Sequence, residues 1–231
     1  MHTFILVHGA WHGGDVWQPL VKELQTVGKQ ASAVTLTGLG ERKHLLSDAI
    51  DLETHIQDVV GHIESQDFDE VTLVGWSYGG MVIAGVLPRI TQRVKAMVYV
   101  DAFVPDKNMA LIDYILAPEG KTYYEEFKNS RQAIPPPPFE FFGMRDSYWI
   151  SHLAPRVSPH PWKTFFQPVQ TYPAAREVRT SYVYCKHDEP TPLTATWEKL
   201  KAEQSIGLYE IETNHYCMLT HPKWLTTVLL D

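Results

Sequence analysis

The sequence predicts an α/β protein built on a parallel sheet. Short apolar runs alternate along the chain with longer stretches in which apolar residues recur at helical spacing. This alternation is typical of parallel strands joined by right-handed helical crossovers. It stops near Asp101 and resumes at Ser181, which indicates one insertion. We therefore expect a single domain over residues 1–231, with a mainly parallel sheet of about six strands flanked by helices and a lid insertion over about 103–178.

Each expected element follows from a local pattern. The strands are continuous apolar runs, as in sheets covered on both faces, and comprise Phe4–Val7, Ala31–Leu36, Val71–Val74, Val94–Val100, Ser181–Cys185 and Ile206–Ile211. The helices have apolar residues three and four positions apart, and comprise residues 17–27, 52–63, 81–87, 193–200 and a last helix from about 220. Gly28 and Pro88 lie where the first and third of these helices should end.

The composition is that of a folded globular protein with an acidic balance. The chain has 231 residues, a formal net charge of −7, 44% apolar residues and 20% charged residues, which argues against intrinsic disorder. Lysine and arginine are scattered singly, so we expect no nucleic-acid partner. The two cysteines, Cys185 and Cys217, cannot make a disulfide-rich scaffold. Without a signal-peptide pattern or an apolar run near the ~20 residues of a membrane span, we expect a cytoplasmic protein away from membranes, monomeric or homodimeric.

The strongest chemical signal is the Gly-x-Ser-x-Gly pattern of residues 75–79, which follows an apolar strand and precedes a helix. A serine at such a sharp turn has a strained backbone and an exposed hydroxyl, and the flanking glycines let other backbone pass close to it. The start of the following helix favours developing negative charge. The pattern therefore predicts that Ser77 is a catalytic nucleophile, against the alternative of a glycine-rich turn that merely contains serine.

A nucleophilic serine needs a base, and His215 is the best of the eleven histidines. It follows the last expected strand, and the chain order serine, acid, histidine requires a late base. The later rival His221 precedes a proline at the expected start of the final helix. We expect Asp188, which follows the strand ending at Cys185, to orient the histidine. Asp101 also follows a strand and is its main rival, with Glu189 as a near neighbour.

A glycine-rich loop after the first strand supplies a further element of the expected site. An oxyanion hole takes one N–H from the residue after the nucleophile, here Tyr78, and one from this loop, for which Ala10 is our choice. His8 and His12 have the i, i+4 spacing of helical metal ligands, but they straddle a glycine turn, so we expect no metal. No Gly-Lys-Ser/Thr sequence follows the glycines, which excludes a phosphate-binding loop of that type.

Together these elements resemble the α/β-hydrolase superfamily, over nearly the whole chain outside the insertion. Residues 4–14, residues 75–80 and the Asp-Ala-Phe-Val-Pro sequence of residues 101–105 look like the compact branch that contains plant methylesterases, hydroxynitrile lyases and related bacterial esterases. The resemblance implies a Ser77–Asp188–His215 triad, the Ala10 and Tyr78 oxyanion hole, and no cofactor. The chain departs from many relatives at Asn214, where they carry an acidic residue, and in the proline run of the insertion.

We expect the insertion to lie over Ser77 as a lid and to contribute aromatic side chains to a pocket. Apolar pockets bind apolar ligands, so a small apolar or aromatic carboxylic ester is the favoured substrate. The expected substrate-binding residues are Trp11, Trp149 and Phe165, although aromatics of the insertion can also form its own core. The alternatives are a hydroxynitrile lyase or cofactor-free dioxygenase on the same fold, or a receptor that binds a ligand without chemistry.

Overall fold

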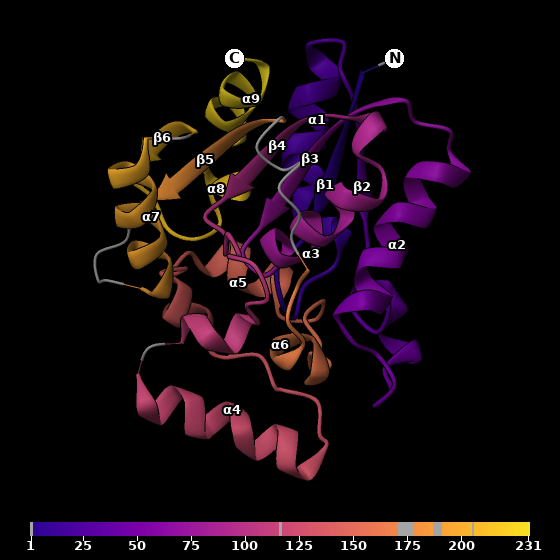
Figure 1. The fold of residues 1–231 in the computed structure, drawn as a ribbon. Helices are drawn as coiled ribbons and strands as arrows, with labels where there is room; N and C mark the ends of the chain where they lie inside the picture. The colour runs from indigo at the N-terminus through magenta and orange to yellow at the C-terminus, as the bar shows by residue number, and fades with distance from the viewer. Residues whose placement is uncertain (1, 116, 171–177, 187–190, 205) are drawn as a thin grey trace.

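A computed structural model describes residues 2–115, 117–170, 178–186, 191–204 and 206–231. Its six strands form one parallel sheet in the order β2-β1-β3-β4-β5-β6 (Figure 1). They are β1 (His2–Val7), β2 (Gln30–Val34), β3 (Glu70–Trp76), β4 (Val94–Val100), β5 (Arg179–Cys185) and β6 (Gly207–Ile211). The predicted fold class, a parallel sheet flanked by helices, is confirmed.

Five of the described helices lie near the stretches that periodicity predicts, and the other four, three in the insertion and one at Cys217–Thr220, were not predicted. They are α1 (Gln18–Thr26), α2 (Leu52–Ser65), α3 (Gly79–Val86), α4 (Pro118–Ser130), α5 (Ser147–Leu153), α6 (Lys163–Phe166), α7 (Pro192–Glu203), α8 (Cys217–Thr220) and α9 (Pro222–Leu230). Short 3₁₀ turns lie at Gly14–Trp17, Gly40–Leu45, Leu87–Arg89, Thr91–Arg93, Leu111–Tyr114 and Phe139–Phe142. None of the helices in the described ranges is long and apolar enough to span a membrane.

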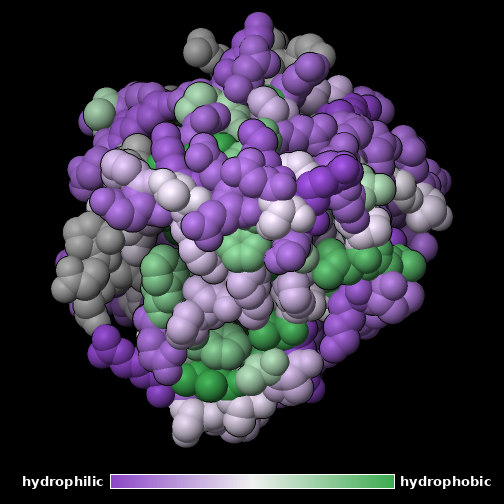
Figure 2. All heavy atoms as spheres, turned by 90° about the horizontal axis from the view of Figure 1, so that it is seen from below, coloured by the Kyte–Doolittle hydropathy of each residue, from purple (hydrophilic) through white to green (hydrophobic). Residues whose placement is uncertain are grey.

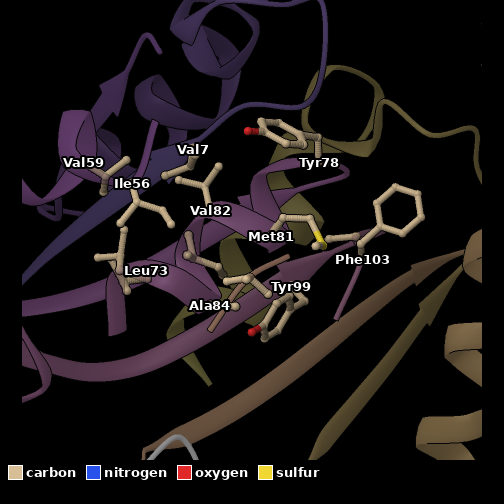
Figure 3. Packing of buried hydrophobic residues seen from close by; sticks show 14 of the residues in the cluster. Val7, Ile56, Val59, Leu73, Tyr78, Met81, Val82, Ala84, Tyr99 and Phe103 are labelled. Carbon is tan, nitrogen blue, oxygen red and sulfur yellow. The ribbon is translucent and has the colours of Figure 1, made fainter. Parts of the chain in front are cut away.

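Two apolar clusters cover the two faces of the sheet, which explains why its strands are continuously apolar. Ile5 and Val7 point into one cluster, with residues of α2, α3 and α7, whereas Phe4 and Leu6 point into the other, with residues of α1, α8 and α9. Figure 3 shows part of the first cluster, where Ile56 of α2 and Val82 of α3 pack beside Val7. The alternation of neighbouring side chains between two covered faces keeps the strands in register.

The order of the strands determines where a site can form. From β1 the chain passes to β2 on one side and then to β3 on the other side of β1, so the direction of winding reverses between β1 and β3. In open α/β sheets, ligands bind outside the carboxyl ends of the strands at such a switch point. The loop after β1 and the turn after β3, which hold Ala10 and Ser77, meet there.

Residues 103–178, between β4 and β5, form the inserted segment, of which 116 and 171–177 lie outside the described residues. It contains α4, α5 and α6, and one antiparallel bridge joins Ile134 to His160. In Figure 1 these helices lie below the sheet, with α4 farthest from it. Seen from that side, apolar residues interrupt a mostly polar surface (Figure 2).

Candidate active site

Ser77 occupies the turn between β3 and α3 with a left-handed backbone, at φ +55°. The glycine that begins α3 makes this turn possible, because a Cβ on Gly79 would lie 2.5 Å from the carbonyl oxygen of Val7. The Ser77 N–H donates to the carbonyl of Val100 at 3.3 Å, and its own carbonyl accepts from the N–H of Phe103 at 3.2 Å. The strained turn predicted at Ser77 is confirmed, and Ser77 lines a cavity.

His215 lies between β6 and α8, is 3% exposed, and lines the same cavity. Its ring stacks on Phe142 of the inserted segment, with 5.2 Å between ring centroids, and packs against Trp76 at 4.9 Å. The same two residues also hydrogen-bond to the backbone of His215. The His215 N–H donates to the Phe142 carbonyl at 3.2 Å, and the Trp76 Nε1–H donates to the His215 carbonyl at 2.8 Å. The ring of His215 thus contacts two aromatic rings, and its backbone is held at both the N–H and the carbonyl.

Among the described residues, the carboxylate that contacts His215 is that of Asp101, which directly follows β4. Its Oδ2 lies 2.6 Å from His215 Nδ1, and its Oδ1 accepts the N–H of Cys185 at 3.2 Å. Asp101 is fully buried and left-handed, at φ +41°. The structure thus places Asp101, the main rival that the sequence offered, against His215. Asp188 lies outside the described residues, so the choice of that residue stays a prediction.

The two expected oxyanion donors, Ala10 and Tyr78, both line the cavity beside Ser77. Within the described residues, neither backbone N–H donates to a protein acceptor. The Tyr78 N–H lies at the start of α3, where the helix dipole favours negative charge. The two N–H groups are thus available to an oxygen atom bound next to Ser77.

A cavity of about 1010 Å³ opens on these groups. Trp11 and Phe165, two of the three expected substrate-binding residues, line it. Trp149 does not: it packs against the opposite apolar cluster, with its ring 5.1 Å from that of Tyr148. Other apolar lining residues come from the inserted segment, namely Phe103, Leu111, Ile115, Tyr124 and Phe142. Charged residues also line the cavity, namely Glu140, Arg145, Lys186 and Glu212.

Several buried histidines surround the loop that holds Ala10. Burial lowers the pKa of His8 to about 3 and that of His12 to about 4, so both rings are neutral near pH 7. Each is engaged by the backbone, His8 with the carbonyl of Gly9 at 2.8 Å and His12 with that of Ala10 at 2.7 Å. No group of three or more metal-ligating side chains occurs among the described residues.

The sequence carried no signal for some residues that shape the site. Trp76 occupies a variable position of the serine motif, and nothing in that motif indicates that its ring holds the His215 loop. Phe142 and His160 lie in the inserted segment, where no periodic pattern places side chains. Only the folded chain brings them to the residues at the carboxyl ends of the strands.

Known proteins with similar sequences and folds indicate the family of this chain. The family described as alpha/beta hydrolase matches residues 4–228. A carbendazim-hydrolysing esterase from Nocardioides sp. (strain SG-4G) is 49% identical over 122 residues, which cover 52% of this chain and 50% of that protein. The match thus spans half the length of that relative. Polyneuridine aldehyde esterase from Rauvolfia serpentina is 25% identical over 99% of this chain and 94% of its own.

Among solved structures, an extracellular alpha/beta-hydrolase from a Paenibacillus species has the same fold. The TM-score is 0.85 at 21% sequence identity, over 100% of this chain and 98% of that one.

Proposed function

Because the chain belongs to the alpha/beta hydrolase family, we propose that it is a serine hydrolase that cleaves a small carboxylic ester through an acyl-enzyme. One observation carries the proposal. A strained Ser77 and a histidine paired at 2.6 Å with a buried carboxylate line one largely apolar cavity. The esterases among its relatives support the same class of reaction.

In the proposed mechanism, His215 removes the proton of the Ser77 hydroxyl as its oxygen attacks the ester carbonyl carbon. Asp101 holds the histidine in the tautomer with the proton on Nδ1 and stabilises the cation that forms. The N–H groups of Ala10 and Tyr78 bind the oxyanion, and the loss of one such donor typically costs about 10²–10³ in rate. His215 protonates the departing alkoxide, then activates a water that releases the acid and restores Ser77.

We propose that the inserted segment acts as a lid that determines the substrate. It contributes Tyr124, Phe142 and Phe165 to the cavity, and such apolar walls favour an apolar or aromatic ester. By closing the cavity, this segment would also exclude water and strengthen the contacts of the oxyanion.

A hydroxynitrile lyase is the second candidate, and two positions argue against it. In the lyases that the sequence resembles, a threonine follows the first motif histidine and a lysine follows the catalytic one. Here a Cβ on Gly9 would lie 2.9 Å from the Ser77 Cβ, so no larger side chain fits there without a shift. Tyr216 occupies the second position, and burial raises its pKa, so it carries no charge that would stabilise cyanide.

The test supplies mandelonitrile and a matched aryl acetate at equal concentration and measures cyanide and acetate. We expect acetate release at a rate that saturates with substrate, and cyanide at the buffer background. Cyanide well above background with the acetate untouched would establish the lyase instead. Turnover of neither compound, nor of a wider panel of esters, thioesters and lactones, would favour a receptor that only binds its ligand.

A further inference from the structure

We propose that His160, in the inserted segment, is a positioning residue for the oxyanion hole, because it accepts the N–H of Trp11 and so holds the loop that presents Ala10. The inference rests on the proposed hydrolase function. It makes the inserted segment part of the machinery that stabilises the transition state, in addition to its place in the wall of the cavity.

The conformation of Trp11 is the first observation. Its backbone is left-handed, at φ +67°, which is unfavourable for a bulky residue and persists only where surrounding contacts enforce it. Three contacts with the inserted segment do so. The Trp11 N–H donates to His160 Nδ1 at 3.3 Å, its carbonyl accepts the N–H of Ser158 at 2.9 Å, and its Nε1–H donates to the carbonyl of Ile134 at 2.9 Å.

The hydrogen bonds of His160 select one tautomer. Because Nδ1 accepts from Trp11, the ring proton lies on Nε2, which donates to Thr164 Oγ1 at 2.8 Å. That hydroxyl in turn donates a hydrogen bond to the carbonyl of Pro161 at 2.7 Å. His160 is fully buried, and desolvation lowers its pKa well below the ordinary value, so the neutral ring keeps an acceptor toward Trp11.

The contact at Trp11 acts on the Ala10 donor through the adjoining peptide. His160 holds the N–H of the Ala10–Trp11 peptide, and His12 Nδ1–H donates to the carbonyl of that same peptide at 2.7 Å. In the preceding peptide, His8 Nδ1–H donates to the carbonyl of Gly9 at 2.8 Å. The N–H and C=O of a trans peptide point in opposite directions, so these bonds leave the Ala10 N–H directed away from His8. Two consecutive peptide planes are thereby fixed.

His160 also contacts the second oxyanion residue. Its ring meets that of Tyr78 edge to face, with 4.8 Å between centroids, and the Tyr78 hydroxyl donates to His55 Nδ1 at 2.8 Å. One side chain of the inserted segment therefore lies against Trp11, which follows Ala10 in the loop, and against Tyr78 itself. A misplaced oxyanion donor weakens binding of the transition state more than that of the ester, so its loss should lower kcat and leave KM nearly unchanged.

The test compares His160→Asn with His160→Gln. The amide oxygen of asparagine occupies the position of Nδ1 and can accept from Trp11, whereas that of glutamine lies near Nε2 and cannot. Asparagine is also the smaller side chain and leaves the larger void, so His160→Asn should be the less stable variant. We expect His160→Asn to keep kcat within about threefold, and His160→Gln to lose about 10- to 100-fold in kcat with KM unchanged. If the more stable variant, His160→Gln, instead has the higher kcat, the proposal is overturned.

A second measurement separates this inference from the proposed function. Hydrogen exchange of the Trp11 backbone amide, followed by NMR, requires no substrate. We expect slow exchange in the wild type and His160→Asn, and faster exchange in His160→Gln. Equal exchange in all three proteins would refute the contact, whatever the enzyme hydrolyses. A wild type that protects the Trp11 amide but hydrolyses no ester would refute only the proposed function.

Discussion

The Asp101 carboxylate is placed to control the tautomer of a single ring. Its Oδ2 faces His215 Nδ1, and its Oδ1 is held by the N–H of Cys185, so the carboxylate cannot rotate without breaking a second bond. An asparagine can keep the bond from Cys185 only by turning its NH₂ group toward His215. It would then donate to Nδ1 and leave the proton on Nε2, where the base must accept one.

We therefore expect Asp101→Asn to lower kcat by about 10³–10⁴ while the protein stays folded. The measurement is turnover of an aryl ester beside a thermal melt, with Asp188→Asn as the matched comparison. If Asp188→Asn is inactive and Asp101→Asn is nearly as active as the wild type, then Asp188 is the residue that orients His215.

The sequence could predict Ser77 as nucleophile and His215 as base because each has a local signature or a place in the chain order. The acid had no such signature. Asp101 and Asp188 both follow the carboxyl end of a strand. A sequence pattern does not give the distance from either carboxylate to His215, so it could not decide between them. The substrate-binding aromatics raised a similar difficulty: Trp11 and Phe165 line the cavity and Trp149 does not, because their placement depends on how an irregular segment folds.

At the scale of elements, the close packing of α3 against β1 supports the serine turn. Gly79 and Gly61 are both helical glycines, but their surroundings differ. A Cβ on Gly79 would lie 2.5 Å from the Val7 carbonyl oxygen, whereas a Cβ on Gly61 of α2 has nothing within 4 Å. Alanine should therefore have opposite effects at these two positions.

We expect Gly79→Ala to lower the free energy of unfolding by about 1–3 kcal/mol through steric overlap. Gly61→Ala should raise the same quantity by about 0.5–1 kcal/mol, because alanine restricts the unfolded chain and favours the helix. Urea unfolding of both variants provides the measurement. A stabilising Gly79→Ala would contradict the close approach of α3 to β1.

The regular elements could be predicted because their patterns are local. Apolar runs identified all six strands, and the periodic stretches identified the helices that cover them. The inserted segment could be recognised only by its irregular composition. Its contacts with Trp11 and His215 join residues far apart in the chain, so no local pattern reports them.

At the scale of the whole molecule, buried neutral histidines make stability depend on pH. Burial lowers the pKa of His8 to about 3, and that of His12 and His55 to about 4, from an ordinary value of 6.5. Below pH 6.5 the unfolded chain binds protons at these rings and the folded protein does not, so acidification favours unfolding. Their contribution is complete above pH 6.5 and is lost as the pH falls toward 4.

We expect the free energy of unfolding to fall by about 2 kcal/mol for each such histidine between pH 7 and pH 5. In His55→Gln this decrease should be smaller by the contribution of one histidine, about 2 kcal/mol, because the variant lacks one buried ring. Urea unfolding across this pH range measures the slopes, and an equal slope in the wild type and His55→Gln would show that His55 does not contribute.

The central claim is that Ser77 is the nucleophile, and covalent labelling tests it most directly. A serine-directed organophosphonate should add the mass of one inhibitor to the wild-type protein, because His215 and the two N–H donors activate Ser77 toward a tetrahedral adduct. Intact mass spectrometry of the wild type and Ser77→Ala provides the measurement. The account predicts one adduct in the wild type and none in Ser77→Ala. Undiminished labelling of Ser77→Ala, or an active wild type that is never labelled, would contradict it.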